Sequence, residues 1–141
     1  MSRYTFTHKV SATPEQVWAE IADHEGMANW TPAWLPLPKI AMEADGSPDR
    51  NGVGAVRQLR LAGPPIRERI TDFQPGKRLA YEALGGVPAR NYTGEITLNP
   101  AGTGTRIDWT IDFEPAFPGA QLILRTAIGA FARVLARRCN R

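Results

Sequence analysis

The chain has 141 residues, of which 43% are hydrophobic and 22% are charged, and a formal net charge of +3. This size and composition are typical of one globular domain, and we expect residues 1–141 to form it. No apolar run approaches the roughly 20 residues that span a bilayer, so we expect no integral membrane segment. The single cysteine, Cys139, excludes an intramolecular disulfide and favours a reducing, cytoplasmic location.

The positive charge is concentrated towards the C-terminus, where five arginines and no acidic residue follow Glu114. These arginines could contact an anionic partner, or they could cover the outer face of a terminal helix and favour its negative end. Nucleic-acid binding would require aromatic residues among the basic ones. The polar side of this segment has none, so we expect no nucleic-acid partner. With only His8 and His24 as histidines and no Cys/His cluster, we expect no metal site and no cofactor.

The first third of the chain predicts one strand and two short helices. Residues 3–10 alternate between apolar and polar side chains, as a strand does. Thr13 and Gln16 have the spacing of a capping box, which predicts a helix that begins directly after Thr13. Residues 23–29 predict a second, poorer helix. The proline-rich residues 31–38 are typical of an extended connector.

The rest of the chain predicts a series of strands followed by one long helix. Short turns join alternating segments, which indicates an antiparallel meander over residues 39–42, 53–61, 66–73, 78–84, 90–98 and 105–113. Residues 117–138 contain no proline after Pro118. Apolar residues recur there at helical spacing, at Leu124, Ile128, Phe131 and Leu135, and predict an amphipathic helix of about five turns. Helices beside an antiparallel sheet make the fold class α+β.

Several segments occur in an order that is known from one superfamily: Ala12–Trp18, Asp23, Trp30, Gly52–Arg57, Glu68, Pro75–Tyr81 and Gly104–Trp109. The order resembles that of the START-like (SRPBCC) superfamily, which includes the major birch pollen allergen and the polyketide cyclase/dehydrase proteins. The resemblance implies a helix-grip fold, in which a curved antiparallel sheet of six or seven strands wraps around the long C-terminal helix, with two short helices after the first strand. It also implies fatty acyl, sterol, polyketide-like or aromatic ligands. Because the superfamily includes binders, transporters and enzymes, the resemblance does not select one function.

The alternation of residues predicts which side chains face the space between sheet and helix. On the last strand Trp109 and Phe113 share the apolar face, and the same rule turns Tyr81 and Tyr92 inward. The facing stripe of the helix consists of Leu124, Ile128 and Phe131, with small residues at Ala120, Ala127 and Gly129. Small residues at a helix–sheet crossing leave room, so we expect an internal cavity there.

A charged pair is predicted on the apolar face of the sheet. If residues 62–65 form the turn, Leu59 pairs with Glu68 and Arg57 pairs with Ile70, so that Arg57 and Glu68 lie diagonally opposite each other. A buried unpaired charge costs several kcal/mol, so we expect the two side chains to pair. They would form either a structural ion pair or a polar handle for the carbonyl or hydroxyl group of a ligand.

Two residues in the irregular segments have two interpretations each. Trp30 would either fill a gap in the core or cover the cavity mouth and stack on a flat ligand. His24, beside Asp23, would be either an exposed loop residue or an acid–base group near neutral pH.

The first hypothesis is a binding protein, monomeric or homodimeric, that holds a small hydrophobic ligand in the internal cavity. The predicted ligand-binding residues are Trp30, Arg57, Glu68, Tyr81, Tyr92, Trp109, Phe113, Leu124, Ile128 and Phe131. The alternative is a polyketide cyclase, aromatase or dehydratase that uses the same cavity, with Glu68 and a tyrosine or His24 moving a proton. No residue set identifies catalytic residues. A third class, an interaction module that shares the fold, stays open because of the basic terminal helix.

Overall fold

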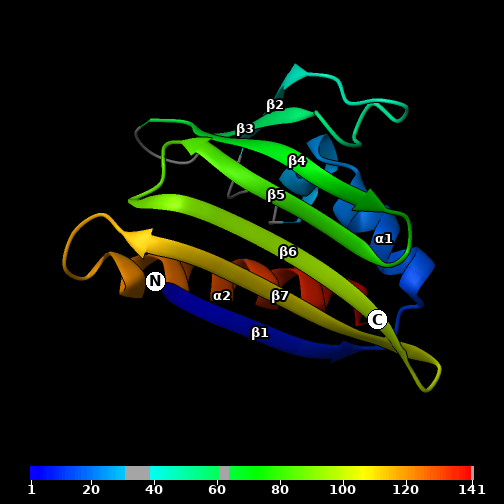
Figure 1. Ribbon diagram of the computed structural model, residues 1–141. Coiled ribbons are helices and arrows are strands. Elements are labelled where there is room, and N and C mark those ends of the chain that lie inside the picture. Colours follow the sequence, from blue (N-terminus) through cyan, green and yellow to red (C-terminus); the bar gives the residue numbers. More distant parts are fainter. Residues whose placement is uncertain (31–38, 61–63, 141) are drawn as a thin grey trace.

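The computed structural model describes residues 1–30, 39–60 and 64–140 (Figure 1). Its elements, in chain order, are β1 (Ser2–Val10), α1 (Pro14–Ala22), the 3₁₀-helix η1 (Glu25–Asn29), β2 (Lys39–Ala44), β3 (Val56–Arg60), β4 (Ile66–Gln74), β5 (Arg78–Gly85), β6 (Ala89–Ala101), β7 (Gly104–Pro115) and α2 (Ala120–Cys139). The predicted connector at residues 31–38 lies outside the described residues. Within the described ranges no helix is long and apolar enough to cross a membrane.

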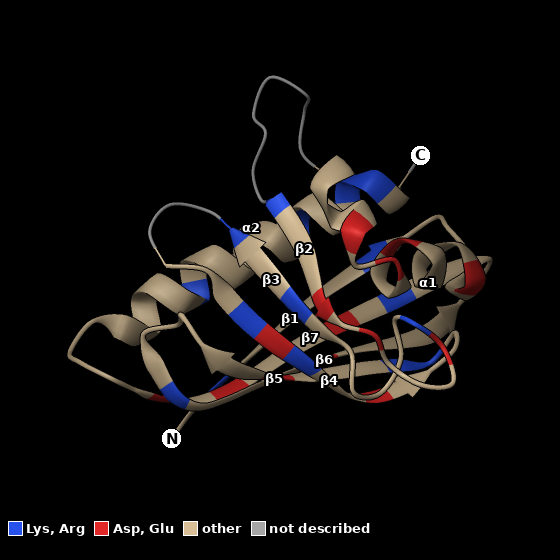
Figure 2. Ribbon diagram, turned by 90° about the horizontal axis from the view of Figure 1, so that it is seen from above, with Lys and Arg blue, Asp and Glu red and all other residues tan. Residues whose placement is uncertain are grey.

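The strands form one antiparallel sheet in the order β1-β7-β6-β5-β4-β3-β2. The sheet curves around α2, which runs behind β7 and β1 in Figure 1 and along the hollow of the sheet when seen from above in Figure 2. The helix α1 packs against β6 and β7 near the C-terminal end of α2, where Glu20 pairs with Arg138. This arrangement confirms the predicted α+β class and the helix-grip order of elements.

The helix α1 begins where the capping box in the sequence predicts. The Thr13 side chain accepts a hydrogen bond from the Gln16 backbone at 3.3 Å, and the Gln16 side chain accepts one from the Thr13 backbone at 2.9 Å. This is the predicted capping box, and it satisfies two N–H groups that the first helical turn leaves free. The predicted second helix is the 3₁₀-helix η1, in which Met27 is buried.

The strand β6 is longer than predicted. The sequence predicts a closing turn at residues 99–102, but β6 continues to Ala101. The hairpin is tighter, with Pro100 still opposite Thr105 in β7. The Leu98 N–H donates to the Lys77 carbonyl on the β5 side of the strand. The nitrogen of Pro100 points to that same side. Because β5 begins opposite Thr97, no strand lies beside Pro100 there. The proline can therefore extend β6 without breaking a hydrogen bond of the sheet.

The pairing of β3 with β4 differs from the prediction by two residues. Leu59 lies opposite Ile66, and Arg57 lies directly opposite Glu68 instead of diagonally. Side chains alternate with a period of two, so a shift of two keeps every side chain on its predicted face. The alternation therefore predicted the faces correctly but could not fix the register.

The helix α2 begins at Ala120, three residues later than predicted. Gly119 precedes it with φ +92°, a left-handed conformation that glycine adopts without steric cost. Pro118 was expected in the first helical turn and instead lies before the helix. Phe117, predicted as helical, is 47% exposed in the turn that leads to α2.

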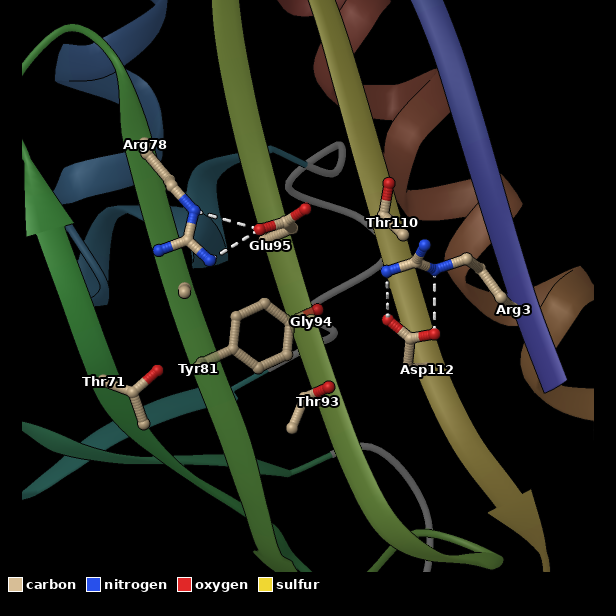
Figure 3. Close-up of a pocket in the computed structure, with 10 residues that line it drawn as sticks. Arg3, Thr71, Arg78, Tyr81, Thr93, Gly94, Glu95, Thr110 and Asp112 are labelled. Atoms are coloured by element: carbon tan, nitrogen blue, oxygen red, sulfur yellow. Dashed lines mark hydrogen bonds and ion pairs between the residues drawn. The ribbon is translucent and has the colours of Figure 1, made fainter. Parts of the chain in front are cut away.

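The inner face of the sheet is the predicted one, with Ile107, Trp109, Ile111 and Phe113 all buried along β7. The outer face carries ion pairs between neighbouring strands. Arg78 pairs with Glu95, and Arg3 pairs with Asp112 (Figure 3).

A glycine in β6 allows an aromatic ring to lie flat across the sheet. Tyr81 in β5 is directly opposite Gly94, and its ring lies over the glycine (Figure 3). A Cβ at Gly94 would be 2.2 Å from the Tyr81 ring carbon Cζ. No real Cβ approaches so closely, so this position requires a glycine as long as the ring keeps its place.

We expect Gly94→Ala to lower the unfolding free energy by about 1–3 kcal/mol or more, because the added methyl group overpacks a filled site. Gly85→Ala is the matched control. Gly85 lies in β5, the strand that carries Tyr81, and an added Cβ at Gly85 meets nothing within 4 Å. It should be neutral or slightly stabilising. Urea denaturation of both variants checks this, and equal stabilities would contradict the close packing of Tyr81 on Gly94.

Candidate functional site

A cavity of about 70 Å³ lies between α2 and the inner face of the sheet. Most of the predicted ligand-binding residues line it, namely Arg57, Glu68, Tyr81, Tyr92, Trp109, Leu124, Ile128 and Phe131. The sheet contributes the charged groups, the two tyrosines and Trp109, whereas α2 contributes only apolar side chains. The cavity therefore has one apolar wall and one wall on which polar groups are available.

Two predicted residues are not in the cavity lining. Phe113 is fully buried and packs against Tyr92 and Tyr4, with ring centroids 6.0 and 6.2 Å apart. It lies four residues beyond Trp109 along β7, which is about 13 Å of extended strand, and this places it past the end of the cavity. Trp30 is 8% exposed and belongs to the hydrophobic core next to η1. Its buried Nε1 has no hydrogen-bond partner within residues 1–30, 39–60 and 64–140.

Five lining residues were not among the predicted binding residues: Met27, Leu59, Ile66, Val87 and Ala127. The strand alternation already placed Leu59 and Ile66 on the face of Arg57 and Glu68, and helical spacing placed Ala127 on the facing stripe. Those signals were sufficient to include them. No periodic pattern marks Val87, which lies in the turn between β5 and β6.

Arg57 and Glu68 form an ion pair inside the protein. Both Nε and Nη2 of Arg57 lie 2.9 Å from Oε1 of Glu68, and the two side chains are only 3% and 8% exposed. The strands β3 and β4 place the residues opposite each other. Removing two charges from water is costly, and this cost is offset only when the charges are paired and hydrogen-bonded as they are here.

His24 completes this polar cluster. Nη1 of Arg57 donates to Nδ1 of His24 at 3.0 Å, and Nε2 of His24 donates to the Asn51 carbonyl at 2.8 Å. Arginine can only donate, so Nδ1 is the acceptor and Nε2 carries the proton. Burial and, after it, the neighbouring charge of Arg57 together lower the pKa of His24 to about 3. His24 is thus a neutral, fully buried residue, and the expectation of an exposed loop residue was wrong.

The aromatic residues surround the same cluster. The Arg57 guanidinium carbon lies 5.1 Å from the centre of the Tyr81 ring, within the range of a cation–π contact. Nε1 of Trp109 donates to the Tyr81 hydroxyl at 2.9 Å. Burial raises the pKa of both Tyr81 and Tyr92, and the charge of Glu68 adds to this effect. Both hydroxyl groups therefore keep their protons and can donate hydrogen bonds.

We expect Arg57→Met to lower the unfolding free energy by about 3–5 kcal/mol, because it leaves the Glu68 carboxylate buried without its partner. The double variant Arg57→Met/Glu68→Leu removes both charges and should be more stable than the single variant. Arg69→Met is the matched control on the outer face, where Arg69 pairs with Glu82 and is half exposed. It should cost about 0–1 kcal/mol. Equal losses for Arg57→Met and Arg69→Met would contradict a buried pair.

The pKa of His24 predicts a pH dependence of stability. The unfolded chain binds a proton near the ordinary pKa of 6.5, whereas the folded protein resists protonation until about pH 3. The stabilisation is therefore complete above pH 6.5 and is lost as the pH falls towards 3. Between pH 7 and pH 4, His24→Gln should lose about 3 kcal/mol less stability than the parent protein. Urea denaturation of both proteins at both pH values checks this, and the same loss in each would contradict a buried neutral His24.

The described residues contain no group of three or more His, Cys, Asp or Glu side chains that could hold a metal ion. The polar groups that line the cavity include one ion pair and two protonated tyrosines. Such groups can bind and orient the polar end of an organic molecule.

Solved structures resemble the chain over nearly its whole length. XoxI from Bacillus cereus is 21% identical and has a TM-score of 0.74, covering 99% of this chain and 96% of its own. The Aha1 dimer from Colwellia psychrerythraea is 15% identical with a TM-score of 0.78, covering 99% and 97%. Ara h 8.0201 is 14% identical with a TM-score of 0.70, covering 95% and 94%. At these identities the likeness shows the fold alone.

The sequence comparisons identify the family. No curated protein matches the chain. The family model described as polyketide cyclase / dehydrase and lipid transport matches residues 1–141. Because this match spans the entire sequence, the chain belongs to the polyketide cyclase/dehydrase and lipid transport family.

Proposed function

We propose that the protein binds a small hydrophobic molecule in the cavity between α2 and the sheet. The observation that carries the proposal is the division of the cavity wall. Leu124, Ala127, Ile128 and Phe131 form an apolar side, and the buried polar cluster around Arg57 lies across from it. Ligand sites generally combine an apolar lining with a few placed polar groups. The family description, which includes lipid transport, supports the same function.

The volume of the cavity restricts how binding occurs. A cavity of about 150 Å³ is known to hold benzene, and this one is about 70 Å³. A ligand must therefore widen the cavity as it binds. Ile128, Phe131 and Val87 are the lining residues best placed to yield, because they are only partly buried. We propose that their side chains move aside while the polar cluster keeps its position.

Binding is favoured over the alternative of a cyclase, aromatase or dehydratase. Such an enzyme needs a group that moves a proton. Both ring nitrogens of His24 are already hydrogen-bonded, and its low pKa keeps it neutral. The raised pKa values of Tyr81 and Tyr92 suit hydrogen-bond donors and not bases. Glu68 is the remaining candidate base, and its pairing with Arg57 supports a fixed polar contact more than proton transfer.

The oligomeric state and the location stay predictions. The Colwellia protein is described as a dimer, and for this chain we propose a monomer or homodimer in the cytoplasm. Sedimentation equilibrium of the purified protein distinguishes the two states.

We expect the uncharged dye Nile red to bind the protein and to fluoresce more strongly when bound. Ala127→Leu adds an isopropyl group to the cavity wall, so it should weaken dye binding at least tenfold. Ala130→Leu makes the same change on the exposed side of α2 and should leave the affinity unchanged. Fluorescence titration measures both. If both variants bind like the parent, the dye does not occupy this cavity and the proposal fails. Mass spectrometry of solvent extracts then identifies any molecule that co-purifies.

A further inference from the structure

We infer that the cavity selects an uncharged ligand that carries a hydroxyl group, and that it excludes carboxylates. This inference rests on the proposed binding function and specifies its ligand class. It follows from the hydrogen bonds that the cluster of Arg57, Glu68 and His24 already makes.

The guanidinium of Arg57 has almost no free hydrogen-bond donors for a ligand. A guanidinium has five N–H donors. The Nε and Nη2 donors bind Glu68 at 2.9 Å, and Nη1 donates to Nδ1 of His24 at 3.0 Å and to Sδ of Met27 at 3.4 Å. These contacts use four of the five donors. The two-pronged contact by which arginine usually holds a carboxylate would therefore require Arg57 to release Glu68.

The cluster of Arg57, Glu68 and His24 also has no net positive charge that would attract an anionic ligand. The positive charge of Arg57 is balanced by Glu68, and His24 accepts a hydrogen bond from Arg57 through an unprotonated nitrogen. A ligand carboxylate would place an additional negative charge beside the buried Glu68. A buried charge without a partner is strongly unfavourable, so a fatty acid would bind poorly with its carboxylate at this end of the cavity.

The remaining hydrogen-bonding capacity fits a hydroxyl group. Both contacts from Arg57 go to Oε1 of Glu68, so Arg57 does not occupy Oε2. A carboxylate oxygen only accepts, so its partner must donate. The Tyr81 hydroxyl is already engaged within the protein, because its oxygen accepts from Trp109 and it also forms a side-chain hydrogen bond with Tyr92. A ligand hydroxyl can donate to Glu68, as an alcohol or a phenol does.

Three probes of the same ring system test this inference: 2-naphthol, 2-naphthoate and naphthalene. Their affinities at pH 7 are measured from chemical shift changes in ¹H–¹⁵N NMR spectra, which include the indole N–H of Trp109. We expect 2-naphthol to bind at least tenfold more tightly than 2-naphthoate and more tightly than naphthalene. Equal or tighter binding of 2-naphthoate would overturn the inference and leave the proposed function intact. Absence of binding by all three probes would overturn both.

Glu68→Gln provides the sharper test. It leaves Arg57 as an unbalanced cation, so the ratio of 2-naphthol to 2-naphthoate affinity should fall at least tenfold. Glu82→Gln is the matched control on the outer face, where Glu82 pairs with Arg69, and it should keep the parent ratio. An unchanged ratio in Glu68→Gln overturns the inference. If Glu68→Gln does not fold, Arg57→Met/Glu68→Leu replaces it. In that variant 2-naphthol should lose its advantage over naphthalene, and a retained advantage overturns the inference.

Discussion

The buried ion pair of Arg57 and Glu68 determines how the elements around the cavity are held together. Arg57 reaches from β3 to Glu68 in β4, to His24 after α1 and to Met27 in η1. It also lies over the ring of Tyr81 in β5. One side chain of β3 therefore contacts the next two strands, β4 and β5, and the segment that follows α1. Because each contact is directional, the cluster fixes these elements relative to one another more narrowly than apolar packing would.

Stability alone does not explain such a cluster. Replacing a buried ion pair by well-packed apolar residues is often neutral or stabilising, because two charges no longer have to leave water. Leu59, Ile66 and Ile70 surround the pair on the same face, so apolar residues already fit this part of the sheet. The charged pair makes physical sense as the polar end of a cavity whose other walls are apolar. This reasoning links the energetics of the pair to the proposed ligand.

The sequence predicted the fold well because its signals are local or periodic. The capping box at Thr13 and the alternation along β7 each depend on residues close together in the chain, and both were confirmed. The register of β3 and β4 could not be predicted in the same way, since a shift of two residues leaves the alternation unchanged. The buried environment of His24 could not be predicted from the sequence either. Its partners Asn51 and Arg57 are far away in the chain, and only the tertiary fold brings them to its ring.

The small residues of α2 show how the cavity itself arises, and here the structure separates three cases that the sequence treated alike. A Cβ at Gly129 would lie 3.1 Å from Cε1 of Phe6, so this glycine lets the helix approach β1 and leaves no space. Ala120 is fully buried and is not part of the cavity lining. Ala127 does line the cavity, beside Leu124 and Ile128. The helix thus comes close to the sheet at Gly129 and stands off at Ala127. A rigid helix held near β1 cannot also press against the polar cluster on β3 and β4, and the space that remains between them is the cavity.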